Sequence, residues 1–133
     1  MIEYRKGYKY QLARTAVTML AFCPPKDIRT GFIELTRDGA LTTKKGYAWD
    51  GPSGLSFDTK NFMHGSLVHD ALYQLMRESL LPLAFKGLAD LELHRLCRAD
   101  GMSTLRAWYV YQAVNLFGMS SARPQTDPVL TAP

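Results

Sequence analysis

The chain has 133 residues with a formal net charge of +4, and 47% of its residues are hydrophobic while 21% are charged. This balance is typical of one globular domain and argues against a disordered chain or a second independent core. No apolar run approaches the roughly 20 residues that cross a bilayer, and the first residues lack the pattern of a secretory signal. We therefore expect a protein made in the cytoplasm, with no signal peptide or transmembrane segment.

The excess of positive charge is mild, and ordinary solvated side chains account for it. No recognised nucleic-acid-binding motif is present, so we expect no nucleic-acid partner. The two cysteines, Cys23 and Cys97, have no spacing typical of a zinc site. We expect both to be buried free thiols, with a single disulfide as the alternative.

The first third of the chain predicts β-structure. Residues 8–20 are rich in the β-branched and aromatic side chains that strands favour. Pro24 and Pro25 interrupt this run, because proline cannot donate to a strand ladder. Residues 31–49 then predict a hairpin with its turn at Asp38-Gly39, a dipeptide that tolerates the positive φ of a tight turn.

The remainder predicts a loop and then helices. Glycine, proline, serine and aspartate crowd the segment 49–61, which is typical of a loop. Thr59 and Ser103 are candidate N-caps, and Gly101 and Gly118 are typical of helix C-terminal ends. Apolar residues at helical spacing predict helices over about 61–78, 83–99 and 104–117.

These elements predict an α+β fold in a single domain. Residues 1–118 would form a small N-terminal antiparallel β-sheet followed by a three-helix subdomain. Residues 119–133 are expected to form a flexible or docking tail.

Polar residues interrupt the apolar run LVHDALYQLM of the first predicted helix. His69 and Asp70 point about 100° apart on a helix, so each needs a partner of its own. Tyr73 lies four residues after His69 and three after Asp70, on the side they share. Asp90 stands among apolar residues of the second predicted helix, and it can face His69 if the two helices pack antiparallel.

This arrangement would let His69 act as a general base. A carboxylate on one ring nitrogen, here Asp90, fixes the tautomer and leaves the other nitrogen to activate a water molecule. Asp70 would then turn toward the preceding loop, where WDGPSG supplies Asp50 and glycines such as Gly51. Two carboxylates with loop carbonyls form the oxygen shell that Ca²⁺ prefers, and such a cation can stabilise an oxyanion.

The order of these residues resembles secreted-type phospholipase A2. That family carries a His-Asp pair followed three residues later by an aromatic residue, as in HDALY here. It also has a glycine-bearing calcium loop before the histidine helix and a supporting aspartate on the next long helix. The resemblance covers about residues 49–97 and implies an antiparallel helix pair and ester hydrolysis. The implied roles are His69 as base, Asp90 as its partner, Tyr73 as supporting donor, and Asp50, Gly51 and Asp70 as calcium ligands.

The chain departs from that family in two respects. The family braces this region with disulfides, one of them beside the histidine, whereas Val68 precedes His69 here and no cystine framework exists. The predicted N-terminal sheet is also not part of the family. Packing would therefore have to hold the site together.

Residues 31–118 are also similar to small phage and prophage proteins that share the order GYAWDGPSG, HDALY and an AD helix. This resemblance implies a phage product made in the host cytoplasm, with virion or tail proteins as partners and the virion as a location. The hydrolase hypothesis adds phospholipid or a membrane surface as a partner. The alternative is a non-catalytic virion or tail-assembly protein that keeps the polar site as a structural brace.

Other polar and aromatic residues are expected to lie outside the site. His64 is expected to face the surface or the loop, and His94 to pack or pair locally. Trp108, Tyr109 and Tyr111 are expected as core and helix-face residues rather than as a platform for stacked bases.

Overall fold

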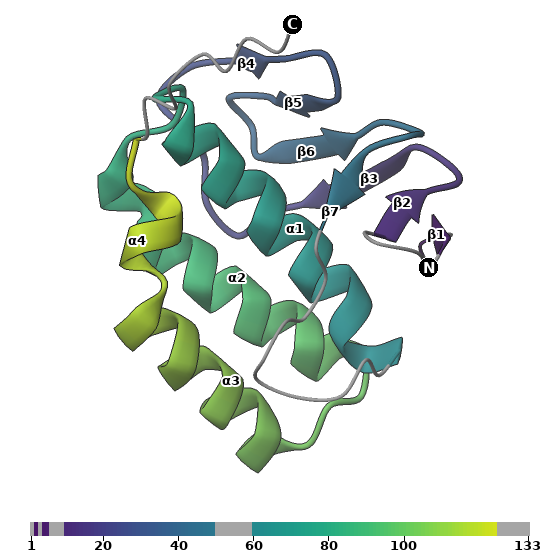
Figure 1. The fold of residues 1–133 in the computed structure, drawn as a ribbon, viewed down its shortest axis with the longest axis vertical. Coiled ribbons are helices and arrows are strands. Elements are labelled where there is room, and N and C mark those ends of the chain that lie inside the picture. The colour runs from purple at the N-terminus through teal and green to yellow at the C-terminus, as the bar shows by residue number, and fades with distance from the viewer. Residues whose placement is uncertain (1, 3, 6–9, 50–59, 125–133) are drawn as a thin grey trace, which may run out of the picture.

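The computed structural model describes residues 2, 4–5, 10–49 and 60–124. Within them, strands precede helices (Figure 1), which confirms the predicted α+β class. The strands are β1 (Tyr4–Arg5), β2 (Tyr10–Leu12), β3 (Ala16–Met19), β4 (Ile28–Arg29), β5 (Ile33–Leu35), β6 (Ala40–Thr43) and β7 (Ala48–Trp49). The helices are α1 (Lys60–Arg77), the 3₁₀ helix η1 (Leu83–Phe85), α2 (Lys86–Ala99), α3 (Thr104–Phe117) and α4 (Met119–Ala122).

The strands divide into two antiparallel sheets, where the sequence predicts one. The first sheet has the order β1-β2-β7 and the second has the order β3-β6-β5-β4. The strand predicted over residues 8–20 is two strands, because the chain bends at Ala13 and Arg14 and passes from one sheet to the other. The predicted turn at Asp38-Gly39 is confirmed, and Gly39 has φ of 90° between the paired strands β5 and β6.

The helices begin and end close to their predicted limits. Ser103 caps α3 as predicted, because its Oγ accepts a hydrogen bond from the backbone N–H of Arg106 at 3.3 Å. Gly101 follows α2 with φ of 95°, the left-handed conformation expected at a helix end. The second predicted helix starts later than expected, because residues 83–85 form a 3₁₀ turn before α2. The predicted cap Thr59 lies outside the described residues.

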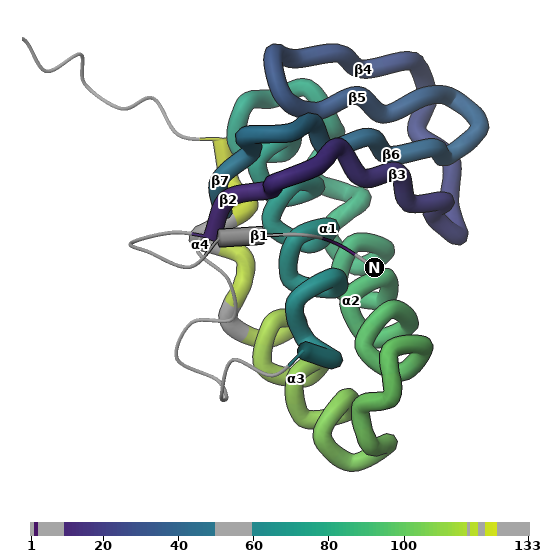
Figure 2. The backbone as a smooth tube through the Cα atoms, turned by 90° about the vertical axis from the view of Figure 1, so that its right-hand side faces the viewer, coloured from purple at the N-terminus to yellow at the C-terminus, as the bar shows by residue number. Residues whose placement is uncertain are grey.

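The three long helices form a layer beside the sheets. In Figure 1 the strands, α1, α2 and α3 follow one another, so that α2 lies between α1 and α3, and Figure 2 shows the strands gathered at one end of the helices. Side chains from both sheets and from α1 make the main core. Its fully buried members include Leu12, Ile33, Leu35, Leu41, Leu67, Leu72 and Leu75.

A smaller apolar cluster holds the three helices together. Its buried members are Phe62, Leu93, Cys97, Met102, Ala107 and Val110. Both cysteines are free, as predicted, but only Cys97 is buried as expected, whereas Cys23 is exposed. Burial raises the pKa of the Cys97 thiol to about 12, so this residue packs as a small apolar group.

The segment predicted as a tail begins with ordered structure. The short helix α4 follows α3, and its Ala122 is fully buried in the main core. The packed part of the chain therefore extends beyond residue 118. Within the described ranges, no helix combines the length and the apolar character needed to cross a membrane.

Candidate functional site

The site lies in the seam between α1 and α2, where the two helices approach closely. A side chain at Gly65 of α1 would place its Cβ 2.9 Å from the Sγ atom of Cys97 and 3.0 Å from Leu93, so only glycine fits without movement. One turn further along α1, His69 lies opposite Asp90 of α2. Residues of increasing number along α1 therefore contact residues of decreasing number along α2. The predicted antiparallel packing is therefore confirmed.

The carboxylate of Asp90 is the centre of the site. It is fully buried, and its Oδ1 lies 2.8 Å from Nε2 of His69 and accepts a hydrogen bond from the Tyr73 hydroxyl at 2.6 Å. The rings of His69 and Tyr73 lie 4.0 Å apart between centroids. The predicted contact of His69 with Asp90 is confirmed, and Tyr73 supports the site by donating to the same oxygen.

Lys86 is a member of this network that the sequence reasoning missed. Its Nζ donates to Oδ2 of Asp90 at 2.7 Å and to the carbonyl oxygens of Val114 and Asn115 at 3.1 and 3.2 Å. These carbonyls belong to the last turn of α3, where the helix dipole favours a cation, and the carbonyl of Val114 also accepts the backbone N–H of Gly118 at 2.8 Å. The available signal was the spacing of four residues between Lys86 and Asp90, which places them on one helix face.

The buried network determines the protonation states. Burial raises the pKa of Asp90, but the hydrogen bonds from His69, Lys86 and Tyr73 together outweigh it and hold that pKa below its usual value. Burial lowers the pKa of His69 below 6.5, an effect that Asp90 opposes and Lys86 reinforces. Burial and the neighbouring Asp90 also raise the pKa of Tyr73. At neutral pH the site therefore contains an ionised Asp90, a neutral His69 and a neutral Tyr73.

The tautomer of His69 follows from its partner. A carboxylate only accepts hydrogen bonds, so a neutral His69 must carry its proton on Nε2 to bond to Asp90. The other ring nitrogen, Nδ1, then has an available lone pair. Among the described residues, Nδ1 of His69 has no hydrogen-bond partner. This is the arrangement that a general base requires.

The predicted calcium ligands are only partly described. Asp70 lies on α1 and is partly exposed, whereas Asp50 and Gly51 lie outside the described residues. Trp49 ends β7, and its Nε1 donates to the Ser66 hydroxyl at 3.1 Å, which brings the start of the glycine-bearing segment to the helix turn before Asp70. The ranges that the structure describes contain no group of three or more acidic, histidine or cysteine side chains that could hold a metal ion. A cation bound at Asp70 would therefore need its other ligands from the segment 50–59, which lies outside the described residues.

Two other histidines lie away from Asp90. His64 is partly buried, with Nε2 2.8 Å from the Thr18 hydroxyl of β3 and Nδ1 3.7 Å from the carboxylate of Asp100. It therefore joins the second sheet to the end of α2. His94 packs edge-on against the ring of Tyr111, as the sequence suggested. Both residues lie outside the site, as predicted, but His64 faces strand β3 and not the surface or the loop that the sequence suggested.

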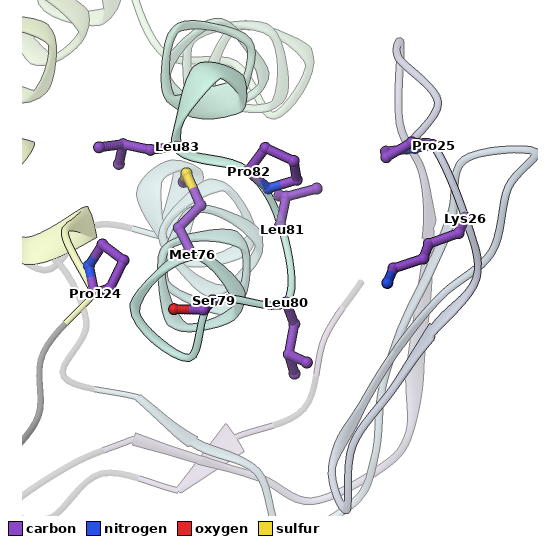
Figure 3. A pocket seen from close by; sticks show the side chains of 9 residues that line it. All are labelled: Pro25, Lys26, Met76, Ser79, Leu80, Leu81, Pro82, Leu83 and Pro124. Carbon is purple, nitrogen blue, oxygen red and sulfur yellow. The ribbon is translucent and has the colours of Figure 1, made fainter.

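Two pockets in the described part of the chain are also separate from the site. One, of about 270 Å³, lies where α1 ends (Figure 3), and its lining residues are Pro25, Lys26, Met76, Ser79, Leu80, Leu81, Pro82, Leu83 and Pro124. The other, of about 290 Å³, lies between α2 and the segment after β3 and is lined by Ala21, Phe22, Leu88, Leu91, Glu92, His94 and Arg95. Neither pocket is lined by His69, Tyr73 or Asp90.

Comparisons with family models, with curated proteins and with solved structures find no match to this chain. The resemblance to phospholipase A2 therefore depends on the order of a few residues and on the contacts among His69, Tyr73 and Asp90.

Proposed function

We propose that the protein is an ester hydrolase of the phospholipase A2 type that uses a water molecule as its nucleophile. One observation carries the proposal: Nε2 of His69 is bound to the buried carboxylate of Asp90, while Nδ1 has no partner among the described residues. Burial also keeps the pKa of His69 below 6.5, so the imidazole is neutral and able to accept a proton at neutral pH.

The reaction would follow from these protonation states. Nδ1 of His69 takes a proton from water as the water oxygen bonds to the ester carbonyl carbon. Asp90 stabilises the imidazolium that forms, and the donors Tyr73 and Lys86 hold the Asp90 carboxylate in place. The tetrahedral intermediate then collapses, and the imidazolium returns the proton to the leaving alkoxide. The products are a carboxylic acid and an alcohol, and His69 is again neutral.

Calcium belongs to the proposal as an additional group. Asp70, Asp50 and a backbone carbonyl such as that of Gly51 would hold it, and it would supply positive charge for the developing oxyanion. The link between Trp49 and Ser66 supports this assignment, because it starts the 50–59 segment beside α1.

The first experiment measures hydrolysis of phospholipid vesicles and of a soluble short-chain ester, with calcium and with a chelator. We expect His69→Ala to lower the rate by about 10²–10⁴-fold, because it removes the general base. His94→Ala is the matched control, since His94 packs on Tyr111 away from Asp90, and it should keep the rate. Circular dichroism checks that both variants are folded. If the native protein cleaves neither substrate with excess calcium, the hydrolase proposal fails.

The second experiment tests the cation. A ligand that binds the folded state raises the melting temperature as its concentration rises. We expect calcium to do so, and we expect Asp70→Asn or Asp50→Asn to abolish the shift. Asp38→Asn, in the β5–β6 turn, is the control that should retain it. A melting temperature that does not respond to calcium in the native protein would remove the cation from the proposal without removing His69.

A second candidate function is a non-catalytic virion or tail component in which the network is a structural brace. Lys86 favours it, because this buried cation ties Asp90 of α2 to the end of α3. Under this alternative, Asp90→Asn should lower the free energy of unfolding by about 3–5 kcal/mol, because it leaves the buried ammonium group of Lys86 without its carboxylate partner. The native protein would then hydrolyse no ester, and it would be found in purified phage particles. Its absence from particles would count against this alternative.

A further inference from the structure

The outward face of α3 is apolar and exposed to solvent. Ala107 and Val110 are fully buried against the rest of the molecule, as expected for the inward face of a packed helix. The opposite face would normally be polar. Instead it carries large apolar side chains whose exposed fractions are 76% for Leu105, 54% for Trp108, 53% for Tyr109 and 65% for Leu116.

These four side chains form one continuous stripe. At 3.6 residues per turn, positions 105, 108, 109 and 116 fall within an arc of about 100° around the helix axis. The stripe runs along the full length of α3, and the half-exposed Met119 of α4 follows it in the chain. Figure 1 shows α3 as the outermost helix of the layer, on the side away from the strands. The stripe is therefore a surface and not part of a seam between elements.

The charges around the stripe are mainly positive, although the exposed Asp100 stands between Arg98 and the start of α3. No aspartate or glutamate occurs from residue 101 to residue 124, a segment that contains all of α3 and α4. Arg98 lies at one end of the stripe, where its Nη1 donates to the carbonyl of Met102 just before α3. Arg123 is exposed at the other end, after α4. An apolar stripe with cationic ends is complementary to an anionic partner.

We propose that the outward face of α3 binds the surface of membranes that contain anionic phospholipids. Tryptophan and tyrosine have an apolar ring and a polar tip, which suits the boundary between headgroups and acyl chains, and leucine inserts below it. The arginines at the ends of the stripe meet the lipid phosphates.

The charge pattern favours lipid over a second copy of the chain. A twofold dimer across this face would bring together two copies of the segment 101–124, which contains Arg106 and Arg123 and no acidic residue, with Asp100 just before it, so like charges would outnumber complementary ones. An anionic membrane supplies the missing negative charge. This surface is separate from the chemistry of His69, and its binding does not require hydrolysis.

The protein contains its own probe for the test. Of its two tryptophans, Trp49 is buried and Trp108 is half exposed, so a change in fluorescence on adding vesicles reports mainly on Trp108. The experiment titrates the full chain with vesicles of phosphatidylcholine alone and with vesicles that also contain phosphatidylglycerol. We expect a blue shift and co-sedimentation with the anionic vesicles, both weaker at high salt.

A matched pair of variants locates the binding face. Leu116→Glu places a charge in the stripe, whereas Val17→Glu makes the same change in net charge on β3, where Val17 is 64% exposed. We expect Leu116→Glu to weaken vesicle binding by about tenfold or more, because it removes a leucine side chain from the acyl region and adds a negative charge that anionic lipid repels. Val17→Glu should bind like the native protein.

Two results would overturn the inference. The first is a vesicle titration in which the protein shows no preference for anionic vesicles, or in which Leu116→Glu and Val17→Glu weaken vesicle binding equally. The other is a concentration-dependent dimer in solution that Leu116→Glu abolishes, because the face would then join two copies of the chain. The titration is also run with a chelator and with His69→Ala. Vesicle binding without hydrolysis refutes only the proposed function, whereas hydrolysis of the soluble ester without vesicle binding refutes only this inference.

Discussion

Ser79, two residues after the end of α1, has an unfavourable backbone conformation. Its φ is 60°, a left-handed value that in the described ranges occurs at this residue alone among non-glycine residues. Ser79 N donates to the carbonyl of Met76 at 3.0 Å, and Leu80 N donates to the carbonyl of Leu75 at 2.8 Å. These two bonds form the Schellman motif, whose left-handed position is usually glycine because other L-residues are destabilised there by about 1–2 kcal/mol.

We predict that Ser79→Gly stabilises the protein. Relief of the strained φ should exceed the greater entropy that glycine loses on folding, for a net gain of about 0.5–1 kcal/mol in the free energy of unfolding. The measurement is urea unfolding, with a higher midpoint and an unchanged slope. Glu78→Gly, one residue earlier, is the control and should destabilise by about 0.5–1 kcal/mol because its φ is not positive. A lower midpoint for Ser79→Gly would contradict the explanation.

The seam between α1 and α2 sets the distance between His69 and Asp90. Gly65 lies at a point of close approach, since a Cβ there would meet Cys97 and Leu93 at 2.9 and 3.0 Å. Gly87, near the start of α2, is different, because a Cβ there would have no atom within 4 Å. Substitution by alanine is therefore expected to have opposite effects on stability at these two helix positions.

We predict that Gly65→Ala destabilises the protein by about 1–3 kcal/mol, because the added methyl group forces α1 and α2 apart. Gly87→Ala should instead stabilise it by about 0.5–1 kcal/mol, through the higher helix propensity of alanine. Thermal unfolding of both variants tests this, together with the double variant Gly65→Ala/Cys97→Ala. Removing the Cys97 sulfur should recover part of the loss at Gly65. If both glycine substitutions act in the same direction, close packing does not explain Gly65.

The buried His69 and the partly buried His64 make the stability of the whole molecule depend on pH. Burial lowers the pKa of His69 and of His64 below the ordinary value of 6.5. The unfolded chain therefore binds protons at a higher pH than the folded chain does, and stability rises with pH wherever the unfolded state binds more protons. The favourable contribution is fully present above about pH 6.5 and is lost as the pH falls through that value toward the folded pKa values.

We predict that the free energy of unfolding falls progressively below about pH 6.5. Chemical denaturation between pH 8 and pH 4.5 measures it. His64→Gln should reduce the slope without removing it, because His69 continues to contribute. Hydrolytic activity should decline over a lower range than that of an exposed histidine, since protonation of His69 removes the base. A stability that stays constant or increases between pH 6.5 and pH 4.5 would refute this account.

The sequence by itself determined the local structure. The Asp38-Gly39 turn, the Ser103 cap and the limits of the three long helices, apart from the start of α2, follow from short-range preferences of φ, capping and apolar spacing. The pairing of His69 with Asp90 could also be anticipated, because burying two polar groups on neighbouring helices requires that they satisfy each other.

The tertiary structure alone decided what depends on distant segments. The segment 8–20 contributes strands to two sheets. Lys86 reaches Asp90 because the carbonyls of α3 also bind its ammonium group. The outward face of α3 stays exposed. Sequence spacing places Lys86 beside Asp90 but says nothing of whether a third helix buries both. Likewise, the sequence pattern around an apolar residue such as Trp108 is the same whether its side chain is buried in the core or exposed on the surface. Only the packed arrangement distinguishes them, because burial depends on which elements meet and not on the residues within one element.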